Sequence, residues 1–242
     1  MPSFIADRPD LVLGAVALIP ALVLLVMVYR HDKIEKEPLS LLLLLLIGGG
    51  AGSVVLSLVL EGVLHNVLDA VITPYDNEIL YYVLFAFVVV ACVEEGTKLL
   101  FLKLFSWKHS AFNFAFDAVV YSVFVSLGFA AIENVKYAFN YGLTTAIARA
   151  VTAVPGHMSF AILMGVFYGR AKLCESYGLQ DKAKRNLVLS FLVPMVFHGF
   201  YDATCMIQND ITIWLFLIFL VFMYILVFRL LRQASRFDRP VV

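Results

Sequence analysis

Long apolar segments constrain this chain more than any other feature of its sequence. A membrane-spanning helix needs about 20 consecutive, mostly apolar residues. Hydrophobic residues make up 62% of the 242 residues and charged residues only 15%, which is outside the range of soluble domains. We therefore predict an all-α, polytopic membrane bundle with seven spans: Leu11–Tyr29, Leu39–Leu60, Ile79–Leu102, Phe112–Asn134, Thr144–Tyr168, Asn186–Met206 and Ile211–Leu231.

The positions of lysine and arginine indicate how these spans are oriented. Basic residues collect in cytoplasmic connections. Fourteen of the eighteen lysines and arginines lie in the first, third and fifth connections and at the C-terminal end of the chain. The second connection, from Glu61 to Glu78, is acidic and contains none. Seven spans with the N-terminus outside and the C-terminus in the cytoplasm satisfy every connection, and we expect residues 1–242 to form one integral-membrane domain.

Composition also excludes some classes of function. No basic run, and no alternation of basic with aromatic residues, suggests a nucleic-acid partner. The three cysteines, Cys92, Cys174 and Cys205, are odd in number and widely spaced, which fits neither a disulfide framework nor a zinc ribbon. The lipid bilayer is therefore the first partner that the sequence implies.

One segment of the third span, Val93–Lys98, places three ionisable groups inside an apolar run. A charged residue at the centre of a spanning helix costs about 2.5–3.5 kcal/mol on insertion scales. These groups must therefore face protein or trapped water. Glu94 and Glu95 lie four and three residues before Lys98, so one carboxylate can pair with the ammonium group on one helix face. We expect the other carboxylate to be free for chemistry.

Histidines in two other spans lie at a similar depth. Measured from the nearest basic residue at the cytoplasmic end of each span, Glu94 lies roughly 13 Å deep and His157 and His198 lie roughly 20 Å deep. All three then fall within the middle of a ~30 Å hydrocarbon core. Asp202 follows His198 by four residues and shares its helix face, where a carboxylate can orient the imidazole ring.

Two carboxylates of the fourth span have less clear positions. Counted from Lys108 along a straight helix, Asp117 would lie level with Glu94, whereas Glu133 would lie roughly 37 Å away, near the outer face. Asp117 can also be a helix anchor and Glu133 an interfacial residue, and a single histidine in a span can be a contact between helices. Two adjacent glutamates and two histidines at matching depth nevertheless favour a chemical role.

Five motifs follow one another along most of the chain. They are Asp32–Pro38, Glu94–Lys98, Phe116–Ala118 with Gly128–Ala130 and Glu133–Asn134, Gly156–His157, and His198–Asp202. This ordered set resembles the PrsW family of intramembrane proteases, which is related to the CAAX prenyl endopeptidases and the bacteriocin-processing enzymes. The resemblance implies hydrolysis of a peptide bond in or near the transmembrane segment of a single-pass protein, such as an anti-sigma factor, in signalling at a prokaryotic plasma membrane. Residues 79–206 would form the catalytic core.

The residues suit that reaction. Either Glu94 or Glu95 can act as the base toward water, and the sequence leaves open which one. His157 and His198 can donate hydrogen bonds to the oxyanion or protonate the leaving amine, with Asp202 orienting the second ring. Supporting roles are expected for Lys98, Asp117, Glu133 and Asn134.

A zinc-dependent version of the same protease is an alternative. Glu95, His157 and His198 could hold a zinc ion whose bound water attacks the peptide bond. No HExxH spacing is present, and we rank a mechanism without a cofactor ahead of the zinc mechanism.

Two non-enzymatic alternatives remain. A proton-coupled transporter also holds acids and histidines at the membrane midplane, but seven spans divide poorly into inverted repeats. A non-catalytic scaffold could keep the fold and bind a membrane helix, as the scaffold subunit of gamma-secretase does in the same superfamily. Retention of both glutamates and both histidines argues against loss of activity. The substrate, the cleaved bond and the oligomeric state are not encoded in any recognisable motif.

Overall fold

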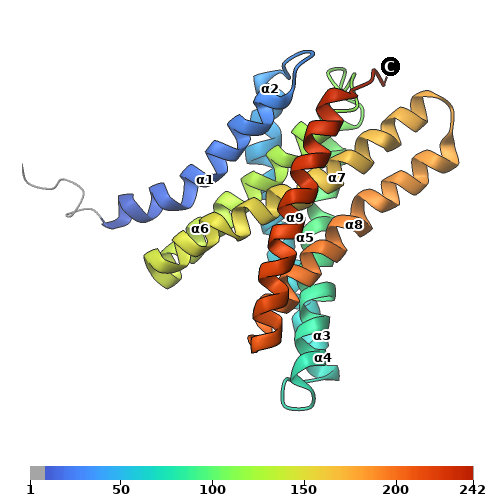
Figure 1. Cartoon of the computed structure of the whole chain (residues 1–242). Coiled ribbons are helices and arrows are strands. Elements are labelled where there is room, and N and C mark those ends of the chain that lie inside the picture. Colours follow the sequence, from blue (N-terminus) through green and yellow to red (C-terminus); the bar gives the residue numbers. More distant parts are fainter. Residues whose placement is uncertain (1–8, 242) are drawn as a thin grey trace, which may run out of the picture.

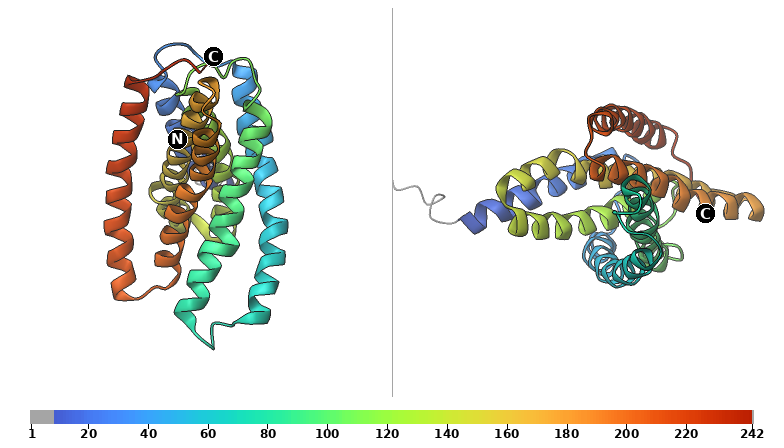
Figure 2. Two further views of the ribbon diagram at one scale, coloured as in Figure 1. Left: turned by 90° about the vertical axis from the view of Figure 1, so that its right-hand side faces the viewer. Right: turned by 90° about the horizontal axis from the view of Figure 1, so that it is seen from below.

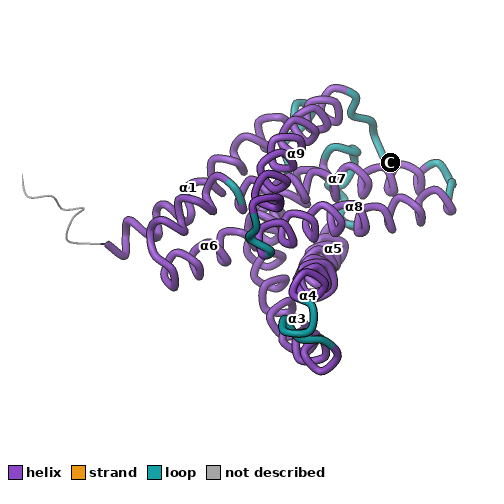
Figure 3. Tube along the Cα trace, turned by 60° about the horizontal axis from the view of Figure 1, so that its bottom comes forward, coloured by secondary structure: helices purple, strands orange, loops and turns teal. Residues whose placement is uncertain are grey.

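The structure is a computed structural model, and it describes residues 9–241. Helices dominate this part of the chain (Figure 3), and extended pairing within it is limited to one bridge between Phe114 and Pro240. The elements are α1 (Pro9–His31), α2 (Leu39–Leu43), η1 (Leu44–Gly49), α3 (Gly50–Val71), α4 (Glu78–Leu84), η2 (Phe85–Ala91), α5 (Cys92–Ser106), α6 (Asp117–Val151), α7 (Ala153–Ser176), α8 (Gln180–Met206) and α9 (Asp210–Arg236), where η1 and η2 are π-helical.

Six helical stretches within the described residues are long and apolar enough to cross a membrane. This confirms the predicted all-α polytopic class. The left view of Figure 2 shows α9 (red) and α3 (cyan) on opposite sides of the bundle, with α8 between them. The stretches are 10–31, 39–71, 78–106, 117–176, 180–206 and 210–236.

The longest of these stretches, 117–176, is a helical hairpin that reverses at Gly142. Gly142 has φ 83° and ψ −174°, in the left-handed region that favours glycine. Beyond this residue the chain runs back along the first arm, so that Arg149 pairs with Glu133. The hairpin and α1 lie side by side at one end of the molecule (Figure 1). Seven spans would require each arm of this hairpin to cross the membrane separately, so the number of spans and their direction across the membrane stay predictions.

The junction of α6 and α7 positions the second arm of the hairpin. Thr152 interrupts the helix with φ −115° and ψ −67°. Pro155 has no N–H group to offer the carbonyl oxygen of Val151, four residues earlier. Tyr224 of α9 compensates, because its hydroxyl group donates to that oxygen at 2.9 Å and lies 3.1 Å from the carbonyl oxygen of Thr152. The break is therefore satisfied by hydrogen bonds just before the turn that carries His157.

Close packing between α3 and α6 brings the first arm of the hairpin against the second span. A Cβ atom added to Gly50 would lie 2.7 Å from the carbonyl carbon of Gly128, and one added to Gly128 would lie 2.0 Å from the carbonyl oxygen of Leu46. Side chains at these two positions are thus incompatible with the packing, as in other membrane helix pairs that use small residues.

Among the helix boundaries that differ from the sequence prediction, two bear on the site. The second span does not end at Leu60, because α3 continues to Val71 and so includes Glu61. The fourth span does not begin at Phe112, because residues 107–116 are non-helical and α6 begins at Asp117. The π-helical turn η2 directly precedes α5, and such turns are frequent near functional sites.

Candidate active site

The α5 residues Glu94, Glu95 and Lys98 lie deep inside the bundle. Their exposed fractions are 4%, 0% and 1%. The Nζ atom of Lys98 donates to Oε2 of Glu94 and to Oε1 of Glu95, each at 2.9 Å. The expectation that one carboxylate would be left free of the ammonium group is therefore wrong: helical spacings of three and four both place a carboxylate over Lys98. The ring of Phe129 covers the same ammonium group, 4.1 Å from its centroid.

His157 of α7 joins this group through one ring nitrogen and faces a further acid with the other. Its Nδ1 lies 3.2 Å from Nζ of Lys98, and its Nε2 lies 3.0 Å from Oε2 of Glu133. An ammonium group can only donate and a carboxylate can only accept. The pattern therefore suits a neutral ring that carries its proton on Nε2.

His198 of α8 lies between two carboxylates. Its Nδ1 is 2.9 Å from Oε1 of Glu95, and its Nε2 is 3.2 Å from Oδ2 of Asp202. Two acceptors suit an imidazolium ring that donates from both nitrogens. Asp202 thus has the predicted position beside the ring. Phe160 stacks on His198 with ring centroids 4.6 Å apart and an interplanar angle of 17°, which fixes the plane of the ring.

Glu133 belongs to this cluster, contrary to the depth estimated from the sequence. That estimate counted residues 109–116 as helix, whereas Glu133 lies only sixteen residues after the start of α6 at Asp117. Arg149 on the returning arm donates to Oε2 of Glu133 at 2.7 Å and to Oδ1 of Asn134 at 3.2 Å. Asn134 also donates to the carbonyl oxygen of Ala17 in α1, at 3.0 Å, so its role is to join helices.

Asp117 lies outside the cluster. It is the first residue of α6, and its Oδ2 accepts from the backbone amides of Asn113 and Phe114 at 3.0 and 2.7 Å. The depth estimate placed it level with Glu94 because it treated the preceding loop as helix. The structure instead brings Asp117 close to Glu35 and Glu37 of the loop after α1.

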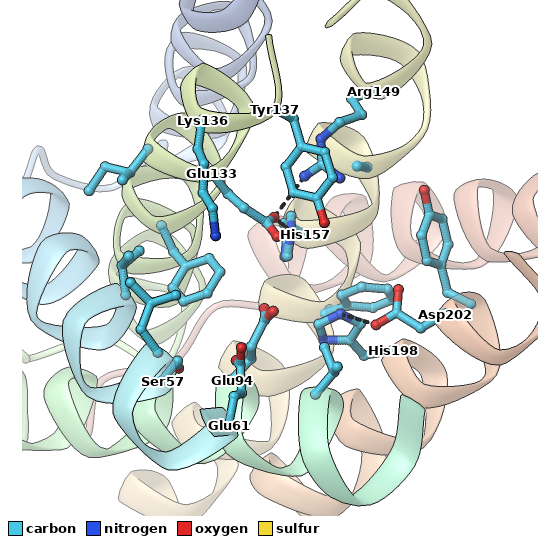
Figure 4. A pocket seen from close by; sticks show the side chains of 18 of the residues that line it. Ser57, Glu61, Glu94, Glu133, Lys136, Tyr137, Arg149, His157, His198 and Asp202 are labelled. Carbon is cyan, nitrogen blue, oxygen red and sulfur yellow. Dashed lines mark hydrogen bonds and ion pairs between the residues drawn. The ribbon is translucent and has the colours of Figure 1, made fainter. Parts of the chain in front are cut away.

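A cavity of about 230 Å³ gives access to the cluster. Glu94, Glu133, His157, His198 and Asp202 line it, as Figure 4 shows, whereas Glu95 does not. The two adjacent glutamates are therefore in different environments. Glu94 faces the cavity, and Glu95 is enclosed between Lys98 and His198 with its Oε2 atom unpaired.

The cavity also has polar lining residues that sequence reasoning did not assign to the site. Glu61 and Ser57 come from α3, four residues apart on one face. That spacing could have revealed them, but the predicted span ended at Leu60. Lys136 and Tyr137 share the face of Glu133 by the same spacing rule. These additional polar lining residues are Ser57, Glu61, Lys136, Tyr137 and Arg149 (Figure 4).

Glu94, His157 and His198 could hold a metal ion. Each offers one ligand atom, and these atoms lie within 4.8 Å of one another. Two imidazoles and one carboxylate are a known donor set of catalytic zinc. The set contains Glu94 in place of Glu95, the glutamate expected from the sequence. The residues therefore fit a zinc ion, provided that His198 releases one of its two carboxylate partners and that the Lys98 ammonium group moves from between Glu94 and His157.

The fold and the site together define a polytopic α-helical membrane protein with a buried centre of glutamates and histidines contributed by α5, α6, α7 and α8. The sequence model described as "PrsW family intramembrane metalloprotease" matches residues 37–230 of the chain. The chain therefore belongs to the PrsW family of intramembrane proteases.

Relatives cover most of the chain. It is 34% identical over 214 residues to Protease PrsW of Clostridioides difficile, with 86% of this chain and 85% of the relative covered. It is 33% identical over 224 residues to Protease PrsW of Geobacillus kaustophilus, with 91% of each chain covered. Protease PrsW of Bacillus subtilis is 34% identical over 135 residues, 54% of this chain and 58% of the relative. No solved structure matches the chain.

Proposed function

We propose that this chain hydrolyses a peptide bond in or near the transmembrane segment of a single-pass membrane protein, with Glu94 as the base that activates water. One observation carries the proposal: Glu94, His157 and His198, from three different helices, offer atoms within 4.8 Å of one another beside one cavity. General-base catalysis needs a carboxylate that both water and substrate can reach. Glu94 meets that requirement, whereas Glu95 is enclosed.

The proposed reaction divides the work among the side chains. Glu94 takes a proton from water as the water oxygen bonds to the carbonyl carbon, and Lys98 stays paired with both glutamates. The Nε2–H group of His198 exchanges Asp202 for the developing oxyanion, which a fixed donor stabilises. The proton held by Glu94 then passes to the leaving amine as the C–N bond breaks. Glu95 and Asp202 orient His198, and Glu133 orients His157.

The proposed substrates are single-pass proteins in a prokaryotic plasma membrane. Anti-sigma-factor-like proteins are the group that the family resemblance suggests. The polar lining of the cavity suits an unfolded stretch of a membrane helix, because it offers hydrogen-bond partners to backbone groups that would be unsatisfied in lipid. Cleavage of such a protein would serve signalling.

A library of tagged single-span proteins, co-expressed with this chain, tests the function. Wild type is expected to release fragments of at least one member, and neither Glu94→Gln nor His198→Ala is expected to do so. Mass spectrometry of the new termini gives the bond that is cleaved. Fragments that appear equally with wild type and both variants would come from host proteases and would contradict the proposal, as would the absence of any fragment across the library.

Zinc catalysis is the second candidate function, favoured by the donor set of Glu94, His157 and His198. When bound, zinc would supply a Lewis acid that polarises the substrate carbonyl group. Against it, both nitrogens of His198 and both nitrogens of His157 already have protein partners within 3.2 Å. We therefore rank the metal-free reaction first.

Chelators separate these two candidates. After treatment with 1,10-phenanthroline, which binds zinc far better than calcium or magnesium, the purified protein is expected to retain its rate of substrate cleavage. Metal analysis of the same sample should find zinc well below one equivalent. Loss of activity on treatment, with recovery on addition of zinc, would establish the metalloprotease instead.

A further inference from the structure

A second group of carboxylates lies at the other end of α6, where the loop after α1 meets the first turn of that helix. Glu35 and Glu37 come from the loop and Asp117 from α6, and each offers an oxygen atom within 4.8 Å of the other two. Glu37 and Asp117 are buried, with exposed fractions of 4% and 1%, whereas Glu35 is exposed. The group is thus closed on the protein side and open on the side of Glu35.

The protein satisfies only part of this group. Tyr121 donates to Oε2 of Glu37, and Oδ2 of Asp117 accepts two backbone amides. The second carboxylate oxygen of Glu37, Oε1, has no hydrogen-bond partner although it is buried. A buried acceptor left unpaired destabilises the folded protein, and more so when it is charged. This oxygen can be satisfied by a proton shared with Asp117 or by a cation from outside the chain.

Basic side chains do not neutralise the group. Within residues 9–241, neither Glu35, Glu37 nor Asp117 forms an ion pair with a lysine or arginine. Lys36, which lies between the two glutamates in sequence, donates instead to the carbonyl oxygens of Tyr29 and Asp32. In the part of the chain that the structure describes, the three carboxyl groups therefore lie close together without a basic partner.

We propose that Glu35, Glu37 and Asp117 bind a hard divalent cation of the Ca²⁺ or Mg²⁺ class. These ions take oxygen ligands, with Ca²⁺ at about 2.3–2.6 Å, so two oxygens on opposite sides of one Ca²⁺ ion are roughly 5 Å apart. The spacing within the group fits inside one such coordination sphere. Its ligand atoms are oxygens without imidazole or thiolate, which selects hard ions over zinc and distinguishes it from the Glu94 cluster.

A cation here would cross-link segments that are distant in sequence. The 32–38 loop would be tied to the start of α6, whose first arm carries Glu133. The C-terminal segment lies at the same end of the bundle, because Asp238 accepts the amide of Phe116 at 2.8 Å and Val241 donates to the carbonyl oxygen of Asn113 at 2.8 Å. The site would therefore stabilise this end of the bundle without contacting the cavity.

Thermal unfolding of the full-length protein in detergent, after removal of metals with EDTA and dialysis, tests the proposal. Addition of CaCl₂ or MgCl₂ up to about 10 mM, above the dissociation constants of weak natural sites, is expected to raise the Tm of wild type by about 3 °C or more. Glu37→Gln and Asp117→Asn, which keep their hydrogen-bond acceptors but lose charge, are expected to abolish this rise.

Two matched controls locate the effect. Glu94→Gln removes a carboxylate from the other candidate cluster, and Glu78→Gln removes an exposed one at the start of α4; both are expected to keep the full rise in Tm. If either buried variant fails to fold, the exposed Glu35→Gln is used and should reduce the rise.

A wild-type Tm that responds to neither cation would overturn the proposal. An equal rise in Tm in every variant would overturn it too. A Tm that rises only when the pH is lowered, and not when a cation is added, would also overturn it, because that result indicates a proton shared between Glu37 and Asp117.

Discussion

Replacing Glu94 with glutamine is expected to lower the rate of substrate cleavage by about 10²–10⁴-fold, the usual contribution of a general base. Glutamine keeps the volume and one acceptor oxygen for Lys98, but it cannot take a proton from water. Glu94 is the one of the two adjacent glutamates that lines the cavity, and its partner Glu95 would still hold the ammonium group. Initial rates for a purified single-span substrate in detergent, at saturating substrate, measure the effect.

Two variants make this result specific. Glu78→Gln, at an exposed position in the first turn of α4, is the control for a lost carboxylate and should cleave at the wild-type rate. Glu95→Gln loses bonds to both Lys98 and His198, so it is expected to lose stability together with activity. If Glu94→Gln cleaved within a few fold of wild type while a folded Glu95→Gln was inactive, the base would be Glu95.

The membrane class and the central residues of the site follow from local features of the sequence. Long apolar runs give the spans, and Glu94, Glu95, His157 and His198 are conspicuous because charge and imidazole are costly inside such runs. The depth of each of these residues could be counted from a basic residue, because the two residues lie in the same helix. The same reasoning placed Asp202 beside His198, and the structure agrees.

Errors arose where the backbone departs from a straight helix. Glu133 was placed near the outer face because the non-helical residues 109–116 were counted as rise along a helix. Arg149 meets Glu133 because the chain reverses at Gly142, within the predicted connection between the fourth and fifth spans, but the spacing of residues along the two arms did not show that these two side chains face each other. Glu61 was assigned to a loop, since an acidic residue after Leu60 is also the pattern of a helix end. Long-range geometry of this kind has no local signature.

Replacing Lys98 with methionine is expected to destabilise the protein by about 3–5 kcal/mol, the typical cost of removing one partner from a buried ion pair. Methionine approximately fills the volume of the lysine stem. What is lost is the ammonium group that holds two carboxylates with exposed fractions of 4% and 0%. The two carboxylates would then remain buried near one another with less positive charge to compensate them. The free energy of unfolding, from reversible denaturant titration in mixed micelles, measures the loss.

A second substitution separates the loss of charge compensation from the loss of packing. In Glu94→Gln with Lys98→Met, the remaining acid Glu95 keeps its 2.9 Å contact with Nδ1 of His198, so much of the lost stability is expected to return. Lys103→Met, at an exposed position near the end of α5, controls for the side-chain change alone and should have little effect. Recovery in the double variant requires an electrostatic cause, because adding a second substitution to a packing defect would not repair it. A Lys98→Met variant within 1 kcal/mol of wild type would mean that water from the cavity reaches both carboxylates, and that the ammonium group is not what keeps the two acids together.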